Sequence, residues 1–422
     1  MSPYGRRATT VGTSHLSVDF ESFRLMESKA AEALVPAVVV RGEVNGLGVV
    51  RSLAQGGVPA IVADTTLRHA AMWSRLGKRH IVRQLSGKPF VEDLLTLQKE
   101  IGARPVLILT DEMAVHTVSE YREDLSPHYR FRLPSSAMVA TLCNKAWFQN
   151  FAEGHGLPLP RTIVIEREGD IAKIPDLGLP VIVKPADKRP VHMGQVERIN
   201  WLDKADDVTA ACRRMLNAGG TLVVQDWIDG PDSSIYFALF HCGPKPASRK
   251  IFFGRKVAAH PAGLGSTAVC VPAPEAADLL RPLTEKFIDI SHYEGLGSLE
   301  FKWDPRARRF VIIEPTVGRT DWQEEIATLN GLNLALIAYC HELGLPPPPQ
   351  QTFDAAAWRE SFLHLGRSSG LAVRTHDGYW RIDDPLPALA FGIDLACRSV
   401  RRLFAQPVLE RRKPPFRRRR IA

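Results

Sequence analysis

The stretch SLEFKWDPRARRFVIIEPTVGR, residues 298–319, predicts a β-hairpin that carries two glutamates. Glu300 and Glu314 each end a short apolar run, and polar, basic residues separate the two runs, as in two strands joined by a turn. Because side chains alternate across a strand, the even separation, 314 − 300 = 14, can bring both carboxylates to one face. Two adjacent carboxylates repel unless a cation joins them, and Mg²⁺ takes one or two carboxylates plus substrate phosphates. The stretch therefore indicates a site for nucleotide-dependent phosphoryl transfer.

The composition is that of an ordinary globular protein. A length of 422 residues suggests two to four domains, and 45% hydrophobic with 24% charged residues is typical of water-soluble chains. There is no run of 18 apolar residues that could span a membrane, and the N-terminus lacks the apolar core of a secretory signal. The six cysteines form no CxxC pair, which favours reduced thiols and a cytoplasmic location.

The net charge of +8 belongs to the C-terminus alone. Residues 401–422 contain nine Lys and Arg residues and one acid, Glu410, so 9 − 1 = +8, and the other 400 residues are neutral. A neutral body does not favour a nucleic-acid partner.

A parallel α/β domain is expected over residues 36–135, after an N-terminal extension, residues 1–35, that contains a helix-like run. Apolar, β-branched runs predict strands, and the strand–turn–helix–strand order predicts a βαβ unit. The expected strands are 36–40, 59–64, 79–83 and 105–110. Gly46 and Gly48 suggest a dinucleotide fingerprint, but Arg51 stands where its third glycine is required, so a tight turn is the preferred interpretation.

A second α/β block follows, over residues 136–348. The stretch 142–158 predicts one helix ended by glycines, and 331–344 predicts an amphipathic helix ended by Gly344. Between them lie several strand-like runs and the glutamate hairpin. The four prolines at 346–349 predict a stiff linker to a C-terminal appendage, residues 349–422.

The order of short motifs in this block resembles the ATP-grasp superfamily, and within it the carboxylate–amine (or carboxylate–thiol) ligases. The series consists of Lys145, VIVKP with Lys184, VVQDWIDGPD, FFGRKV, LEFKWD and IIEPTVGR. The resemblance implies a parallel N-terminal domain followed by two α+β subdomains that close on ATP, here residues 136–230 and 231–348, with a basic helical appendage.

The resemblance also implies roles for single residues. Lys145 and Lys184 would meet the α- and β-phosphates of ATP, and Lys256 would reach the γ-phosphate. Gln225 to Ile228 would hold the adenine edge at a hinge, and Asp232 would hold the ribose hydroxyls. The implied metal ligands are Glu300, Glu314 and, where the family carries asparagine, Thr316; Arg319 would hold the carboxylate or its phosphorylated form. The glycine-containing loop 260–269 would cover the site.

Alternative interpretations stay open for several of these residues. Lys145 and Lys184 could be surface lysines, and Asp232 a turn residue beside Gly230. The glutamates could belong to a surface hairpin with cross-strand cations at Lys302, Arg306, Arg308 and Arg309, although Glu314 follows the apolar run VII, and a buried carboxylate must be compensated.

The resemblance implies an ATP- and Mg²⁺- (or Mn²⁺-) dependent enzyme that forms an acyl phosphate and joins it to an amine, with small-molecule carboxylate and amine substrates. A biotin-type carboxylase acting on bicarbonate and a catalytically weakened, membrane-docked nucleotide-binding protein are the alternatives. The resemblance also implies that a homodimer could form.

The C-terminal stretch 386–409 shows apolar residues at helical spacing together with arginines, and RRKPPFRRRR follows it. Such a basic amphipathic helix could lie on an anionic membrane at the inner face. Packing of the helix on the ligase body, with a solvated tail, is the alternative and is slightly preferred.

Overall fold

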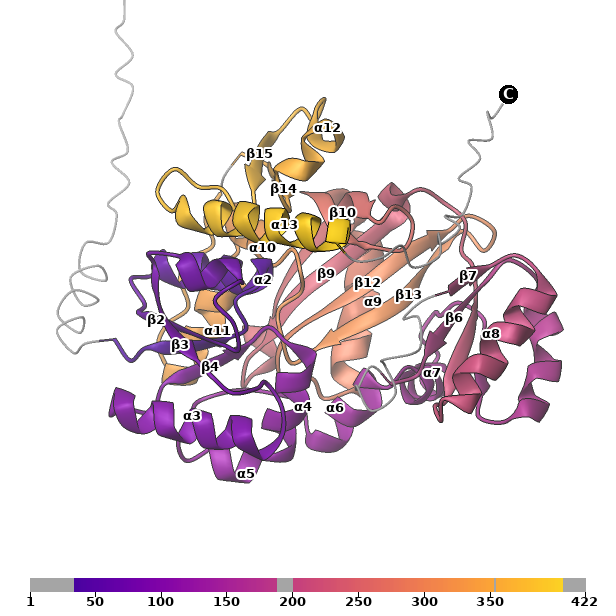
Figure 1. Ribbon diagram of the computed structural model, residues 1–422, viewed down its shortest axis with the longest axis horizontal. Coiled ribbons are helices and arrows are strands. Elements are labelled where there is room, and N and C mark those ends of the chain that lie inside the picture. Colours follow the sequence, from indigo (N-terminus) through magenta and orange to yellow (C-terminus); the bar gives the residue numbers. More distant parts are fainter. Residues whose placement is uncertain (1–33, 188–199, 353, 405–422) are drawn as a thin grey trace, which may run out of the picture.

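Three β-sheets organise the chain. The computed structural model describes residues 34–187, 200–352 and 354–404 (Figure 1), so the expected helix-like run of the N-terminal extension lies outside the described residues. The first sheet has the strand order β3-β2-β1-β4 and is parallel throughout, as predicted. Its strands are β1 (Ala37–Val40), β2 (Ala60–Asp64), β3 (Gly77–Ile81) and β4 (Val106–Leu109). The run AVVV of β1 is buried throughout, as expected for a central strand covered on both faces.

The helices beside this sheet are α2 (Val44–Ala54), α3 (Gly87–Ile101), α4 (Glu112–Glu120), α5 (Arg122–Leu125) and α6 (Ser136–Cys143). The predicted tight turn at Gly46 and Gly48 is wrong, because both glycines lie in the first turns of α2. Their packing explains the residue type: a Cβ at Gly46 would lie 2.1 Å from the Arg41 carbonyl oxygen, and one at Gly48 2.9 Å from a Glu324 carboxylate oxygen. These glycines allow close approach of α2 to its neighbours.

The second sheet is small and antiparallel, with the order β5-β8-β6-β7. Its strands are β5 (Thr162–Ile165), β6 (Val181–Pro185), β7 (Asn200–Leu202) and β8 (Leu222–Asp226), and the neighbouring helices are α7 (Lys145–Gly154) and α8 (Ala205–Asn217). A separate hydrophobic cluster, including Ile165, Val181 and Cys212, joins this sheet to α8. The small sheet therefore has its own core.

The third sheet has seven strands in the order β13-β12-β9-β10-β11-β14-β15. They are β9 (Ile235–Cys242), β10 (Lys250–His260), β11 (Ser266–Pro272), β12 (Gly295–Asp304), β13 (Arg309–Val317), β14 (Ala356–Arg359) and β15 (Arg374–Asp377). The associated helices are α9 (Ala277–Ile290), α10 (Glu325–Leu329), α11 (Leu334–Leu343), α12 (Leu365–Ser368) and α13 (Leu386–Phe404).

The C-terminal residues are less independent than the predicted helical appendage. β14 and β15 extend the seven-stranded sheet, so only part of the stretch after residue 349 is helical. The predicted helix at 386–409 is present as α13, and the polybasic residues after Phe404 lie outside the described residues. The C-terminal stretch is thus partly built into the body of the protein.

Two large hydrophobic clusters join the parallel sheet to the seven-stranded sheet. One includes Val38 and Phe240, and the other includes Val39, Phe237 and Trp358. These two sheets form one packed body, whereas the small antiparallel sheet lies apart from them, at the right of Figure 1. No helix within the described ranges is long and apolar enough to cross a membrane.

Candidate active site

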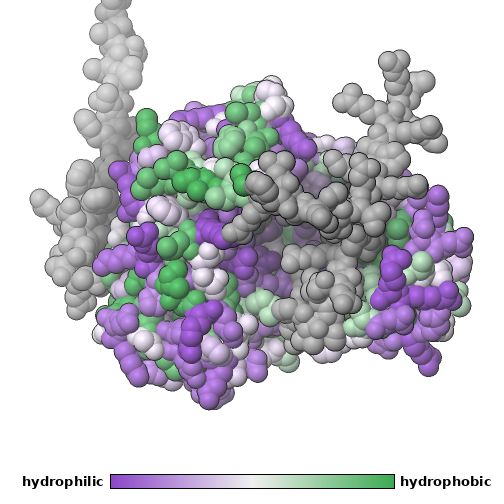
Figure 2. Space-filling view, viewed as in Figure 1, coloured by the Kyte–Doolittle hydropathy of each residue, from purple (hydrophilic) through white to green (hydrophobic). Residues whose placement is uncertain are grey.

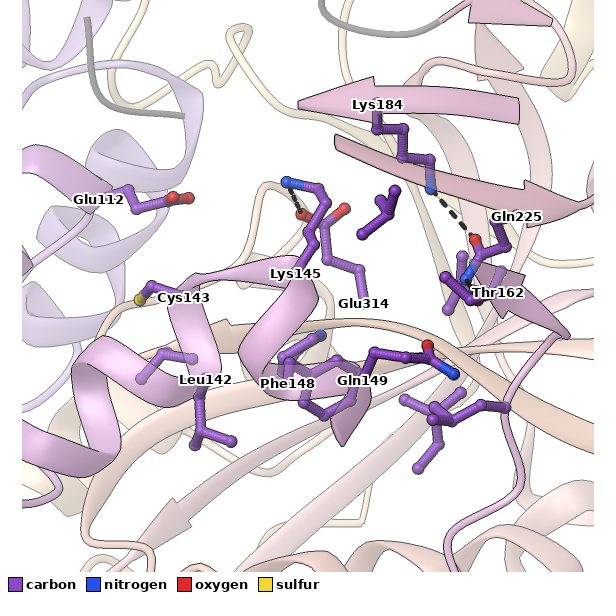
Figure 3. A pocket seen from close by; sticks show the side chains of 16 residues that line it. Glu112, Leu142, Cys143, Lys145, Phe148, Gln149, Thr162, Lys184, Gln225 and Glu314 are labelled. Atoms are coloured by element: carbon purple, nitrogen blue, oxygen red, sulfur yellow. Dashed lines mark hydrogen bonds and ion pairs between the residues drawn. The ribbon is translucent and has the colours of Figure 1, made fainter. Parts of the chain in front are cut away.

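A cleft lies between the small antiparallel sheet and the β12–β13 hairpin, and most of the predicted site residues line it. One part is lined by Lys145, Lys184, Gln225 and Glu314 (Figure 3). The adjoining part adds Ile228, Lys256 and Glu300 to this lining. Because Lys184, Gln225 and Glu314 line both parts, the two parts form one continuous cleft.

The predicted hairpin is present, with Glu300 of β12 directly opposite Glu314 of β13. A register shift follows Glu300. The side chains of Glu300 and Glu314 are 26% and 40% exposed, so the expectation of a buried Glu314 is wrong. Lysines compensate both charges: Lys256 Nζ lies 2.5 Å from Glu300 Oε2, and Lys145 Nζ lies 3.9 Å from Glu314 Oε1. Each carboxylate thus has a cation beside it and lines the cleft.

Lys256 is buried on the long strand β10. Although burial lowers the pKa of its ammonium, the charge and hydrogen bond of Glu300 outweigh this effect and hold the pKa above its usual value. Arg255 points away from the cleft, and its guanidinium lies over the Tyr236 ring at 6.0 Å. The prediction that only one of these two cations faces the site is confirmed.

Lys145 is the first residue of α7. The sequence predicted one helix over 142–158, but Asn144 interrupts it and caps α7, accepting hydrogen bonds from the backbone N–H groups of Ala146 and Trp147. The Lys145 N–H donates to the Ala186 carbonyl at 2.8 Å. This break turns the Lys145 side chain toward Glu314 (Figure 3). Asparagine is a strongly preferred N-cap residue, so a signal for the break was present in the sequence.

Lys184 and Gln225 lie on the neighbouring strands β6 and β8. The Lys184 ammonium donates to Gln225 Oε1 at 3.4 Å, and Gln225 Nε2 donates to Thr162 Oγ1 at 3.1 Å. Thr162 and Gln149 line the cleft but were missed by the sequence prediction, since isolated polar residues on a strand and a helix carry no motif.

Asp232 does not line either part of the cleft. Its two carboxylate oxygens accept hydrogen bonds from the backbone N–H groups of Ala259 and Gly263, both at 2.8 Å. It therefore fastens the glycine-containing loop after β10, and this loop contributes Gly263, Leu264 and Gly265 to the cleft. The predicted ribose contact of Asp232 stays a prediction.

Thr316 and Arg319 lie beyond the lining residues of the two cleft parts. Thr316 is paired with Ser298, on the same face of the hairpin as the glutamates and one pleat further along. Arg319 Nη2 lies 3.7 Å from a carboxylate oxygen of Glu112, which follows β4 at the carboxyl end of the parallel sheet. Glu112 lines the cleft and was missed, although ligands of open parallel sheets bind at that edge.

The residues present suit a hard divalent cation that is completed by a substrate. In the described part of the chain, no three His, Cys, Asp or Glu side chains gather as a metal site of their own. Two opposed carboxylates and a threonine hydroxyl on the same face offer oxygen atoms, the ligands that Mg²⁺ and Mn²⁺ prefer. A nucleotide phosphate would supply the remaining oxygens.

The position of Lys302 differs from the one expected from the sequence. The sequence allowed a surface position on the hairpin, but this side chain is 5% exposed and lines the cleft beside Trp227 and Glu300. Burial lowers the pKa of Lys302 to about 8, partly opposed by the charges of Asp232 and Asp229.

Known proteins resemble this chain in sequence and in fold. No protein-family profile matches the chain. The chain is 24% identical over 331 residues to the D-aspartate ligase of Enterococcus faecium, covering 74% of this chain and 77% of that protein. It is 33% identical over 86 residues to a D-alanine–D-alanine ligase of Acinetobacter baumannii, covering 20% of this chain and 26% of the relative.

Solved structures share the fold at low identity. N5-carboxyaminoimidazole synthetase from Staphylococcus aureus has a TM-score of 0.60 at 12% identity, over 76% of this chain and 81% of its own. Biotin carboxylase from Campylobacter jejuni has a TM-score of 0.59 at 13% identity, over 76% of this chain and 74% of its own.

The fold and the cleft are those of ATP-grasp proteins. In sequence the chain resembles carboxylate–amine ligases, namely the D-aspartate and D-alanine–D-alanine ligases.

Proposed function

We propose that the cleft binds Mg·ATP and transfers its γ-phosphoryl group to the carboxylate of an amino acid, which is then joined to an amine. The observation that carries this proposal is the Glu300–Glu314 pair, directly opposed on the hairpin and flanked by Lys256 and Lys145. A nucleoside triphosphate brings the negative charge that these lysines would neutralise. The carboxylates would then no longer be needed as partners of the lysines and could hold Mg²⁺.

The proposed reaction has two steps. A carboxylate oxygen attacks the γ-phosphorus, the bond to the bridging oxygen breaks, and ADP leaves. The amine nitrogen then attacks the acyl carbon, inorganic phosphate departs, and the nitrogen loses a proton to give the amide. Bound Mg²⁺ supplies charge neutralisation on the phosphates.

The lysines of the cleft would position the phosphates. We assign Lys145 and Lys184 to the α- and β-phosphates and Lys256 to the γ-phosphate, as compact point charges. Gln225 and Ile228 would meet the adenine edge, and Asp232 would act on the ribose side through the loop that it fastens. Glu300, Glu314 and Thr316 would hold the metal.

The amino-acid substrate would bind between the cleft and the parallel sheet. Arg319 and Glu112 form a pair of opposite charges at this boundary, 3.7 Å apart. A guanidinium suits the substrate carboxylate, and a carboxylate suits its ammonium group. Because a D-aspartate ligase is similar to 74% of this chain, D-aspartate is the first candidate.

A coupled assay of ADP and phosphate release tests this proposal. Wild-type protein would be incubated with ATP, Mg²⁺, single D- and L-amino acids and pooled amines. ADP release that requires both an amino acid and Mg²⁺ is expected, with D-aspartate among the active acids. Hydrolysis that ignores every amino acid would contradict the proposal.

The same assay separates two alternatives. The first alternative is a carboxylase that acts on bicarbonate, as the fold shared with biotin carboxylase suggests. For such an enzyme, ADP release would depend on bicarbonate and not on amino acids. Thr316, in place of asparagine, favours a catalytically weakened protein, for which ATP binds without any turnover.

We further propose that α13 brings the ligase to an anionic membrane surface from the cytoplasmic side. One side of the helix packs on the body, where the Phe391 ring stacks on Tyr379 at 4.1 Å. Another side carries apolar residues that are 45–60% exposed, Leu386, Leu389, Ile393 and Val400, and Figure 2 shows apolar surface along this helix. The following sequence is strongly basic. An apolar helix face next to clustered cations suits anionic lipid headgroups, and six free cysteines suit the cytoplasm.

Co-sedimentation with vesicles tests the membrane proposal. Full-length protein should bind vesicles containing phosphatidylglycerol and not those of phosphatidylcholine alone. Truncation after Phe404 and the change Ile393→Asp should each reduce binding; equal binding by all three would contradict the proposal. The predicted homodimer stays a prediction, which light scattering of the purified protein would test.

A further inference from the structure

Lys302 is a fourth lysine of the cleft that the proposed mechanism leaves without a role. It lies on β12 two residues after Glu300, so that the two side chains share a face of the strand. Its side chain is 5% exposed and lines the cleft together with Trp227, Ile228 and Glu300. A lysine placed this deeply in a ligand cleft calls for a physical explanation.

Lys302 differs from the other three lysines in its partners. Lys256 contacts Glu300 at 2.5 Å, Lys145 contacts Glu314 at 3.9 Å, and Lys184 donates to Gln225 at 3.4 Å. Across the described ranges, Lys302 forms neither an ion pair nor a hydrogen bond. Its ammonium instead lies 4.3 Å from the centre of the Trp227 ring.

This arrangement is costly for the folded protein. Burying an ammonium group is unfavourable unless an opposite charge and hydrogen bonds compensate it. A cation–π contact compensates only a part of that cost. Residues that reduce stability in this way are concentrated at functional sites, where a ligand supplies what the protein omits.

The position of Lys302 indicates which part of a nucleotide it would meet. Trp227 lies between Asp226 at the end of β8 and Ile228, in the predicted adenine-binding hinge. Lys145, Lys256 and the glutamates surround the part of the cleft assigned to the phosphates. Lys302 is therefore on the hinge side of the metal pair.

We propose that the Lys302 ammonium donates hydrogen bonds to the nucleoside half of the bound nucleotide, to an acceptor of the base or the ribose. The inference rests on the proposed function, since it assumes that the cleft holds ATP. It adds a nucleotide contact from the hairpin itself, so that one strand supplies both a metal ligand, Glu300, and a nucleoside ligand.

Calorimetric titration with ADP and AMP tests this contact. Three variants are compared with the wild type: Lys302→Met, Lys302→Arg and, as a matched control, Lys245→Met in the exposed turn between β9 and β10. Lys302→Met should weaken both ligands by a similar factor of about 10, as expected for one charged hydrogen bond. Lys302→Arg should keep most of the affinity, and Lys245→Met should bind like the wild type.

Thermal unfolding without nucleotide supplies the second readout. Because Lys302→Met removes a buried charge that is only partly compensated, its unfolding midpoint should equal or exceed that of the wild type, while the stabilisation by ADP falls. Unchanged affinity would overturn the inference. If Lys302→Met lost affinity for ADP but not for AMP, Lys302 would contact the β-phosphate. If the unfolding midpoint of Lys302→Met fell, the lysine would serve to hold Trp227 in place. Either result would also overturn the inference. Wild-type protein that binds no ADP would instead contradict the proposed function itself.

Discussion

The glutamates of the cleft, Glu300 and Glu314, can be compared with those at the start of α10, Glu324 and Glu325. Both sets are close carboxylates accompanied by basic residues. The first set faces the cleft, with 26% and 40% of the side chains exposed, and lysines lie beside it. The second set is almost completely buried, at 2% and 5% exposure.

The buried set has a structural role. Glu325 accepts a hydrogen bond from Arg381 at 2.9 Å and lies 3.9 Å from Arg51, so that α10 connects α2 to the C-terminal residues. Its arginines belong to fixed packing, whereas the lysines of the cleft point into space that a ligand can enter. The comparison teaches that exposure to the cleft, and not the clustering of charge, distinguishes a binding site from a structural network.

Among the variants that keep the glutamate pair, the largest effect is expected for Lys256→Met. Removing the cation beside Glu300 removes a charge contact proposed to act on the transferred phosphoryl group. The amino-acid-dependent rate should fall by about 10²–10³, as for other electrostatic contacts to a transition state. Arg255→Met, on the opposite face of β10, is the control and should retain the wild-type rate. Equal losses in the two variants would show that the strand, and not the cleft charge, is responsible.

Glu325→Gln should act on stability and not on the chemistry. The change leaves Arg51 and Arg381 partly uncompensated in a buried site, which costs about 3 kcal/mol. Denaturant unfolding should show this loss, while the Km for ATP stays the same. Glu285→Gln breaks a half-exposed pair with Arg281 and should cost less than about 1 kcal/mol. Similar losses for both variants would contradict the distinction between the buried and exposed pairs.

Glu324→Gln should raise stability in a pH-dependent way. Burial, with a smaller effect of Glu325, raises the pKa of Glu324 from 4.5 to about 8. Between these values the folded state keeps a proton that the unfolded chain releases, so the stability contributed by Glu324 falls as pH rises from 4.5 to 8. The variant should therefore gain most stability at pH 8.5 and little at pH 4. A gain independent of pH in thermal unfolding would contradict this assignment.

A small, local effect is expected for Asp232→Asn. The change weakens two charge-assisted hydrogen bonds to the backbone of Ala259 and Gly263, at a local cost of about 1 kcal/mol. Hydrogen exchange at these two amides should become faster, and exchange in β1 should not change. Unaltered exchange at the loop would show that Asp232 does not fasten it.

The sequence predicts the parts of the site that depend on local order. Strand alternation predicted both glutamates on one face, but their direct pairing also requires the register shift that follows Glu300. The position of Lys184 near the end of β6 follows from the continuous apolar run before it. The burial of Lys302 could not be predicted, because the neighbouring hinge comes from a strand about 75 residues earlier.

The remaining errors also have physical causes. Glu112 reaches the cleft only because the parallel sheet packs against the hairpin, and no local pattern encodes that contact. Gly46 and Gly48 resembled turn residues, but their lack of a Cβ serves helix packing. The strands of the C-terminal stretch were missed, because β14 and β15 are only four residues long.

The most direct test of the central claim compares ADP release by wild-type protein and Glu314→Ala. Both proteins would be assayed with ATP, Mg²⁺, an active amino acid and an amine, after circular dichroism has shown that both are folded. The account predicts amino-acid-dependent release by the wild type and none by the variant, since the metal-holding pair is broken. Near-normal turnover by a folded Glu314→Ala protein would contradict it.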